Sequence, residues 1–109
     1  MKKIRSCLVL IVTVFSSNLF AWDGVQKGKV GQIHVTGEEN YGFRVTLTSG
    51  VTLCGNQHTW AYLNKSHSNY DSYVSAFLSA KFAGANVTIY TNKDGGSQGY
   101  CRIGYIVVE

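Results

Sequence analysis

The chain has 109 residues, enough for one small domain with a modest hydrophobic core. Its formal net charge is +4, but three positive charges lie in the first five residues, and without them the charge is only +1. Nucleic-acid binding requires a clustered basic face, which a charge of +1 does not indicate, so we expect no nucleic-acid partner.

Residues 1–21 have the layout of a secretory signal peptide. Lys and Arg residues at positions 2–5 form a positive start, and the apolar run at 8–15 is too short to span a bilayer. Ala21, a small residue, precedes Trp22. We therefore expect cleavage after Ala21 and export, with a leader of bacterial style. No second apolar stretch follows, so no membrane span is expected in the mature chain.

Two cysteines, Cys54 and Cys101, remain after the leader. An even number of cysteines in an oxidising compartment predicts a disulfide, with two buried thiols as the alternative. A metal site is not expected, because neither cysteine has a neighbouring Cys or His at the spacing of zinc ligands.

The first half of the mature chain reads as β-strands. Residues Lys29–Thr36 alternate, except that Val30 is out of phase, so a bulge at Gly28 or Gly31 is expected. Tyr41–Thr48 alternates cleanly. The apolar residues expected to point inward from it are Tyr41, Phe43, Val45 and Leu47.

A third strand is expected next. Ser49-Gly50 is typical of a two-residue hairpin turn. Val51–Cys54 would then begin the strand, which could resume after Gly55 and run through His58 to Leu63.

The second half contains a helical pattern between strands. Apolar residues at helical spacing between Tyr70 and Lys81 predict one amphipathic helix, with Ser68 or Asn69 as N-cap and Gly84 as C-cap. A strand with Val87 and Ile89 pointing inward follows at Asn86–Thr91, then a glycine-rich loop at 92–99. A last strand follows at Cys101–Val108. The residues expected on one face of this last strand are Cys101, Ile103, Tyr105 and Val107.

The order strand-strand-strand-helix-strand-strand is that of an OB-fold, a small five-stranded barrel. We therefore predict a single mainly β domain over residues 22–109, with the disulfide joining the third strand to the fifth. An open antiparallel sheet crossed by one helix is the alternative. A small sheet with both faces partly apolar favours closure.

The sequence gives no indication of catalysis. Of the six acidic residues only Glu38 and Glu39 are adjacent, and neighbours on an extended strand end point apart. The three histidines are scattered, no hydrolase elbow is present, and no helix follows the glycine-rich loop as a phosphate site would require. With both mature cysteines paired, no thiol nucleophile remains. We expect no enzyme activity and no cofactor.

Binding is the more natural interpretation. The segment from Cys54 to Asn64 places polar-tipped aromatics and amides on alternate positions. Such surfaces recognise sugars, because an aromatic ring stacks on the C–H face while amides and hydroxyls bond the oxygens. Two alternatives are that the aromatics only cover the end of the barrel, or that they form a subunit contact. The candidate ligand-binding residues are His58, Trp60, Tyr62 and Asn64.

The chain resembles the B subunits of AB5 toxins, in particular the subtilase-cytotoxin and pertussis-like branch. The resemblance rests on the Trp22-Asp23-Gly24 start, a helix containing Tyr and Ala, and the Val87-Thr88-Ile89-Tyr90 strand. It implies an oligomer that binds cell-surface glycans and carries an enzymatic subunit. The branch uses a serine near the mature start for sugar binding. Residues 22–36 contain no serine, so no sugar-binding residue is transferred.

The sequence thus predicts an exported binding module with a glycan or a protein as partner, and the resemblance adds assembly as a homo-oligomer. The alternative is a periplasmic structural or inhibitor protein that binds another bacterial protein.

Overall fold

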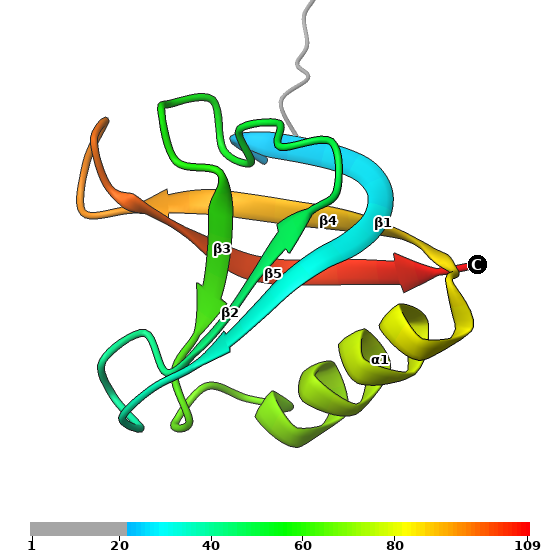
Figure 1. Cartoon of the computed structure of the whole chain (residues 1–109). Coiled ribbons are helices and arrows are strands. Elements are labelled where there is room, and N and C mark those ends of the chain that lie inside the picture. Colours follow the sequence, from blue (N-terminus) through cyan, green and yellow to red (C-terminus); the bar gives the residue numbers. More distant parts are fainter. Residues whose placement is uncertain (1–21) are drawn as a thin grey trace, which may run out of the picture.

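The computed structural model describes residues 22–109, and the predicted leader lies outside this part of the chain. Five strands and one helix follow one another in the predicted order (Figure 1). A mainly β fold with one helix is therefore confirmed. The elements are β1 (Gly24–Val35), β2 (Phe43–Leu47), β3 (Trp60–Leu63), α1 (Tyr70–Ala83), β4 (Asn86–Asp94) and β5 (Tyr100–Val108).

The strands close into a barrel-like ring in the order β1-β2-β3-β5-β4, with β4 returning to β1. All neighbours are antiparallel except β3 and β5, which run parallel and pair only at Ala61–Cys101 and Tyr62–Arg102. Closure of the ring gives every strand two partner strands, and β1 reaches its two partners with different halves of its length. The alternative of an open sheet is not observed.

Strand β1 is long and bent, and it serves two partners. Its first half pairs with β4, and its second half pairs with β2. The predicted bulge is present between Val30 and Ile33, where the register with β2 shifts. The predicted start at Lys29 was wrong, since the strand already begins at Gly24. The glycine-rich, polar residues 24–28 do not show the apolar alternation by which a strand is recognised in sequence.

The hydrophobic core lies inside the ring. The predicted inward positions of β2 and β4 are confirmed, since the side chains there are at most 2% exposed. Tyr41 was expected to belong to this set, but it precedes β2 in a turn with φ 54°. The buried core residues of the strands and helix include Val30, Phe43, Val45, Leu47, Ala61, Leu63, Phe77, Ala80, Val87, Ile89 and Ile103.

The predicted hairpin at Ser49-Gly50 and the strand at Val51–Cys54 are wrong. Gly50 does turn the chain, with φ +74° and its N–H donating to the Leu47 carbonyl at 3.0 Å. The chain then runs as a loop until β3 begins at Trp60. Leu53 and Cys54 are the buried residues of this loop, most of whose other residues are exposed. The Thr91 hydroxyl bonds the Leu53 carbonyl, and the Leu53 N–H bonds the His58 carbonyl at 2.9 Å.

Helix α1 lies across one end of the ring, below the strands in Figure 1. Asn69 is the N-cap, in a left-handed conformation and without a side-chain cap bond, and Gly84 is the expected left-handed C-cap. Two lysines fix the helix to β1. The Lys29 ammonium donates to the Gly84 carbonyl at 2.8 Å, and the Lys81 ammonium donates to the Gly31 carbonyl at 2.6 Å.

Strand β5 changes face halfway along. Its register with β4 shifts opposite the Tyr90–Thr91 step, because Tyr90 pairs with Tyr105 and Thr91 with Ile103. Cys101 and Ile103 point inward as predicted. Tyr105 was predicted to do so as well, but it is 50% exposed, and Ile106 packs against the core instead. The irregularity at Gly104 explains this correction: the Trp22 ring lies where a Cβ of residue 104 would project.

Candidate ligand-binding surface

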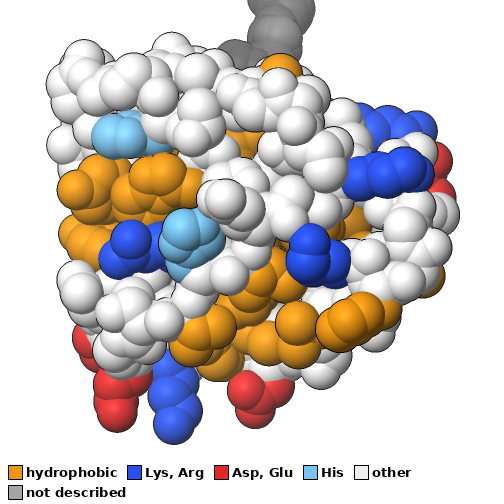
Figure 2. All heavy atoms as spheres, viewed as in Figure 1, with side chains coloured by type: hydrophobic (Ala, Val, Ile, Leu, Met, Phe, Trp, Pro, Cys, Tyr) orange, Lys and Arg blue, Asp and Glu red, His pale blue; other side chains and the backbone are white. Residues whose placement is uncertain are grey.

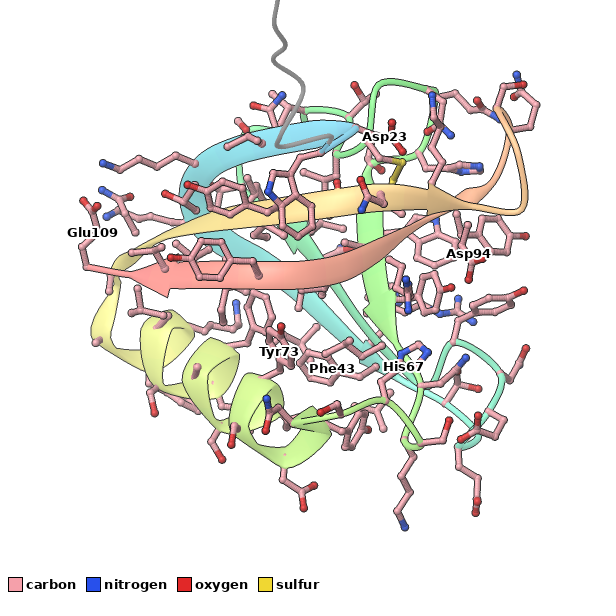
Figure 3. All side chains as sticks on the ribbon, turned by 180° about the vertical axis from the view of Figure 1, so that it is seen from behind. Asp23, Phe43, His67, Tyr73, Asp94 and Glu109 are labelled. Atoms are coloured by element: carbon pink, nitrogen blue, oxygen red, sulfur yellow. A yellow bond between two sulfur atoms is a disulfide. The ribbon has the colours of Figure 1, made fainter. Side chains whose placement is uncertain are left out.

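The predicted disulfide is confirmed. Cys54 and Cys101 are bonded, with Cα atoms 5.5 Å apart and both side chains fully buried. Cys54 lies in the loop before β3, so the bridge joins this loop to β5 and not the third strand to the fifth as expected. The bridge therefore holds residues 54–58 beside the start of β5, where Tyr100 lies. In Figure 3 the sulfur atoms appear close to Asp23.

An aromatic surface covers the outside of the ring where β3 meets the start of β5. The Trp60 and Tyr100 ring centroids are 4.7 Å apart, and the His58 ring lies 4.9 Å from Tyr100. The Tyr41 ring stands edge-on to Tyr62 at 4.7 Å and to Tyr100 at 4.8 Å. We call these five residues the aromatic surface. Figure 2 shows hydrophobic side chains gathered at the left, next to histidine and basic side chains.

The four residues predicted from sequence have different places in this surface. His58 and Trp60 are half-buried and reach the outside. Tyr62 is only 1% exposed and forms the floor under Tyr41. Asn64 lies at the border of the surface, half-buried. Sequence alternation thus identified the correct side of β3, but not which of its residues a ligand can reach.

The Tyr62 hydroxyl is used in a hydrogen bond within the protein. It donates a hydrogen bond to the carboxylate of Asp94, at the end of β4. Burial raises the pKa of Tyr62 well above its usual range, and the bond to Asp94 raises it further. Tyr62 therefore stays neutral and connects the floor of the surface to the turn between β4 and β5.

The Asn64 side chain also has an internal role. Its Oδ1 accepts a hydrogen bond from the Tyr41 N–H at 2.7 Å, with the Gly42 N–H at 3.4 Å. Tyr41 has a positive φ of 54°, a conformation that non-glycine residues adopt only when the surroundings hold them there. Asn64 therefore positions Tyr41 within the aromatic surface.

The turn between β4 and β5 is tied down from the loop before β3. The Asn56 amide donates to the Ser97 carbonyl at 3.2 Å and to the Gly99 carbonyl at 2.8 Å. His58 Nε2 lies 3.1 Å from the Gln98 carbonyl, so Nε2 carries a hydrogen in this tautomer. These bonds, with the disulfide, place Tyr100 beside Trp60 although 40 residues separate them in sequence.

Arg44 supplies a positive charge next to Trp60. Its guanidinium carbon lies 4.8 Å from the centroid of the Trp60 ring, within cation–π distance. Its Nε donates to the Tyr41 carbonyl at 2.9 Å, and one terminal nitrogen donates to the Asn40 carbonyl at 3.1 Å. Within residues 22–109 no carboxylate lies within salt-bridge distance of Arg44.

Two hollows flank the pair of rings formed by Trp60 and Tyr100. Hollow A, beside Tyr100, has a volume of about 360 Å³, and hollow B, beside Trp60, about 200 Å³. Hollow A is lined by Tyr41, Gln57, His58, Asp94, Gln98, Gly99 and Tyr100. Hollow B is lined by Gln32, His34, Arg44, Thr46, Thr59 and Trp60.

Sequence reasoning missed Tyr41, Arg44, Asp94 and Tyr100. Tyr100 could have been found, because it precedes Cys101, and a bridge to Cys54 brings it next to the segment that was singled out. Arg44 could not be found without the register that pairs it with Tyr62 across β2 and β3. Tyr41 was assigned to the core because it continues the alternation of β2.

The described residues contain no group of three or more His, Cys, Asp or Glu side chains that could hold a metal ion. In the same part of the chain, no helix combines the length and the apolar character needed to cross a bilayer.

A comparison with models of protein families finds no match, and comparisons with curated proteins and with solved structures find none either.

Proposed function

We propose that the protein is an exported binding module that recognises glycans through the aromatic surface. The observation that carries the proposal is the joining of Trp60, Tyr100 and His58 into one accessible group with polar hollows on either side. Aromatic rings bordered by amides, imidazoles and a guanidinium offer the stacking and hydrogen bonding that sugar rings require.

Export is the part of the proposal that rests on the leader-like residues 1–21. The Cys54–Cys101 disulfide supports it, because such bridges persist outside the reducing cytosol. Fractionation of cells that express the full chain tests this part. We expect the protein, shortened by the leader, in the periplasm or the medium. Full-length protein retained in the cytosol would contradict export.

A glycan array with the purified mature protein tests recognition. We expect binding that the Trp60→Ala and Tyr100→Ala variants lose. Tyr105→Ala is the matched control: Tyr105 is also an exposed tyrosine on β5, but it contacts Tyr90 on a different part of the ring. Equal loss of binding in the control, or no binding by the parent protein, would contradict glycan recognition at this surface.

The toxin-like version of the proposal adds assembly into a homo-oligomer. Val35 and Phe82 would gain from it, because their apolar side chains are 75% and 87% exposed and a subunit contact would remove them from water. Native mass spectrometry of the secreted protein tests assembly. A monomer at all concentrations would exclude the toxin-like version and leave a monomeric binding module.

One observation favours the second candidate function, binding of another bacterial protein. In the described part of the chain, β5 pairs with β3 only at Cys101 and Arg102, so from Ile103 onward the edge of β5 that faces away from β4 has no strand partner. An unpaired edge can accept an extended segment of another protein as an added strand. Retention of the protein in the periplasm, together with no binding on the glycan array, would favour this function.

A further inference from the structure

The two hollows adjoin the neighbouring rings of Trp60 and Tyr100, a pair that we call the ridge. Tyr100 lines hollow A and Trp60 lines hollow B, and their ring centroids are 4.7 Å apart. A ligand that fills both hollows would therefore contact both rings. This arrangement suits an elongated molecule more than a compact one.

Neither hollow is large by itself. Pockets that bury most of a small ligand have volumes of about 300–1,000 Å³. Hollow A, at about 360 Å³, lies near the lower end of this range, and hollow B, at about 200 Å³, lies below it. A ligand confined to one hollow would leave much of its surface in water and gain little binding energy.

The hollows differ in the hydrogen bonds that they offer. Hollow A contains the Asp94 carboxylate, an acceptor, together with the amides of Gln57 and Gln98. Hollow B contains the Arg44 guanidinium and the Gln32 amide, and no carboxylate lines it. Two of the five N–H groups of Arg44 are used on the Tyr41 and Asn40 carbonyls, which leaves three to donate.

We propose that the aromatic surface binds an oligosaccharide chain that crosses the Trp60–Tyr100 ridge, with one sugar in hollow A and another in hollow B. This inference rests on the proposed glycan recognition and specifies its ligand as a chain of sugars. The hydroxyl groups of the sugar in hollow A donate hydrogen bonds to the Asp94 carboxylate. The sugar in hollow B presents oxygen acceptors to Arg44 and Gln32.

The test uses the oligosaccharide that gives the strongest array signal and the shorter saccharides made by trimming it one sugar at a time. Their affinities for the mature protein are measured by isothermal titration calorimetry. We expect the full oligosaccharide to bind at least tenfold more tightly than any single sugar of the series. A single sugar that binds as tightly as the full chain would overturn the inference.

Two matched substitutions test whether the oligosaccharide occupies each hollow. Gln98→Ala alters hollow A and Gln32→Ala alters hollow B. Both remove an exposed amide and leave intact the backbone bonds of these residues, which are made by the Gln98 carbonyl and the Gln32 N–H. Gln32→Ala also removes the contact between Gln32 Oε1 and His34 Nε2, which are 3.1 Å apart. We expect each variant to weaken binding of the full chain by about 2- to 10-fold, the effect of one lost hydrogen bond. At most one of them should affect a single sugar.

The outcomes separate the inference from the proposed function. If saccharides bind but only one variant weakens the longest chain, the ligand occupies one hollow and the inference is wrong while glycan recognition stands. If no saccharide binds, glycan recognition itself is wrong. Thermal unfolding monitored by circular dichroism checks that both variants are folded, so that a loss of affinity reports on the hollows.

Discussion

The hydroxyl of Tyr62 on β3 donates a hydrogen bond to the carboxylate of Asp94 at the end of β4. The bond joins two segments that are not neighbours in the order of the strands, because β5 lies between β3 and β4. It also connects the floor of the aromatic surface to the end of β4 (Asp94 in Figure 3), from which the turn leads to Tyr100 at the start of β5. The bond therefore contributes to both stability and the shape of the surface, and it depends on a neutral Tyr62.

Alkaline pH should destabilise the protein through Tyr62. Its pKa in the folded state is raised, by burial first and then by Asp94, above the value near 10 expected in the unfolded chain. Its contribution is complete below pH 10 and is lost as the pH rises further, because only the unfolded chain then releases the proton. The loss is at most about 1.4 kcal/mol per pH unit for one such group. Urea unfolding between pH 8 and 11 measures it.

The Tyr62→Phe variant separates this contribution from general alkaline effects. We expect lower stability than the parent at pH 8, because the bond to Asp94 is gone, and a shallower decline above pH 10. Burial also raises the pKa of Tyr73, so the double variant with Tyr73→Phe should decline less steeply still. Parallel stability curves for parent and Tyr62→Phe above pH 10 would show that Tyr62 ionises equally in both states.

The disulfide should be the largest single contribution to stability. The bridge spans 47 positions, and closing a loop of this length stabilises a fold by about 4 kcal/mol in the chain-entropy model. We expect the Cys54→Ala, Cys101→Ala double variant to lose stability of this order in urea unfolding. Reductant should lower the melting temperature of the parent and leave the double variant unchanged. An equal response of both proteins would indicate that the bridge contributes nothing.

Any side chain at position 24 should lower the stability of the fold. A Cβ at this position would lie 1.9 Å from the Leu53 carbonyl oxygen and 2.7 Å from the Cys54 Cα, both backbone atoms. We expect Gly24→Ala to lower the free energy of unfolding by about 1–3 kcal/mol, because β1 or the bridged loop must move. Gly37→Ala is the matched control, since nothing lies within 4 Å of its Cβ position. Similar melting temperatures for the two variants would contradict this close approach.

Local patterns were sufficient to predict the element order of the fold. Alternation located the inward residues of β2 and β4, and helical spacing located α1 with its C-cap at Gly84. The bulge in β1 was predicted because Val30 falls out of phase. These features depend on residues close in sequence, so the sequence shows them directly.

The errors arose where distant segments meet. Leu53 and Cys54 were read as strand residues, but they are apolar because the loop that holds them packs under Thr91 and β1. Tyr105 was placed in the core because no local signal marks the irregularity at Gly104, which Trp22 covers from the other end of the chain. The candidate surface was half predicted for the same reason: Trp60 and His58 came from one segment, whereas Tyr100 and Arg44 join them only through pairing and the disulfide.

Asn64 should act on ligand binding by positioning Tyr41 and not by contact. Asn64→Ala removes the acceptor that the Tyr41 N–H uses at 2.7 Å, and leaving this N–H unpaired should cost about 1–3 kcal/mol of stability. Tyr41, no longer held at φ 54°, should then leave its place against Tyr62 and Tyr100, and glycan affinity should fall with it. Asn64→Asp keeps an oxygen at the same position and should restore both properties, as measured by urea unfolding and calorimetric titration of the array saccharide. Full binding by Asn64→Ala would show that Tyr41 keeps its position without this bond. Lost binding by Asn64→Asp, at normal stability, would instead show that the Asn64 amide nitrogen contacts the sugar directly.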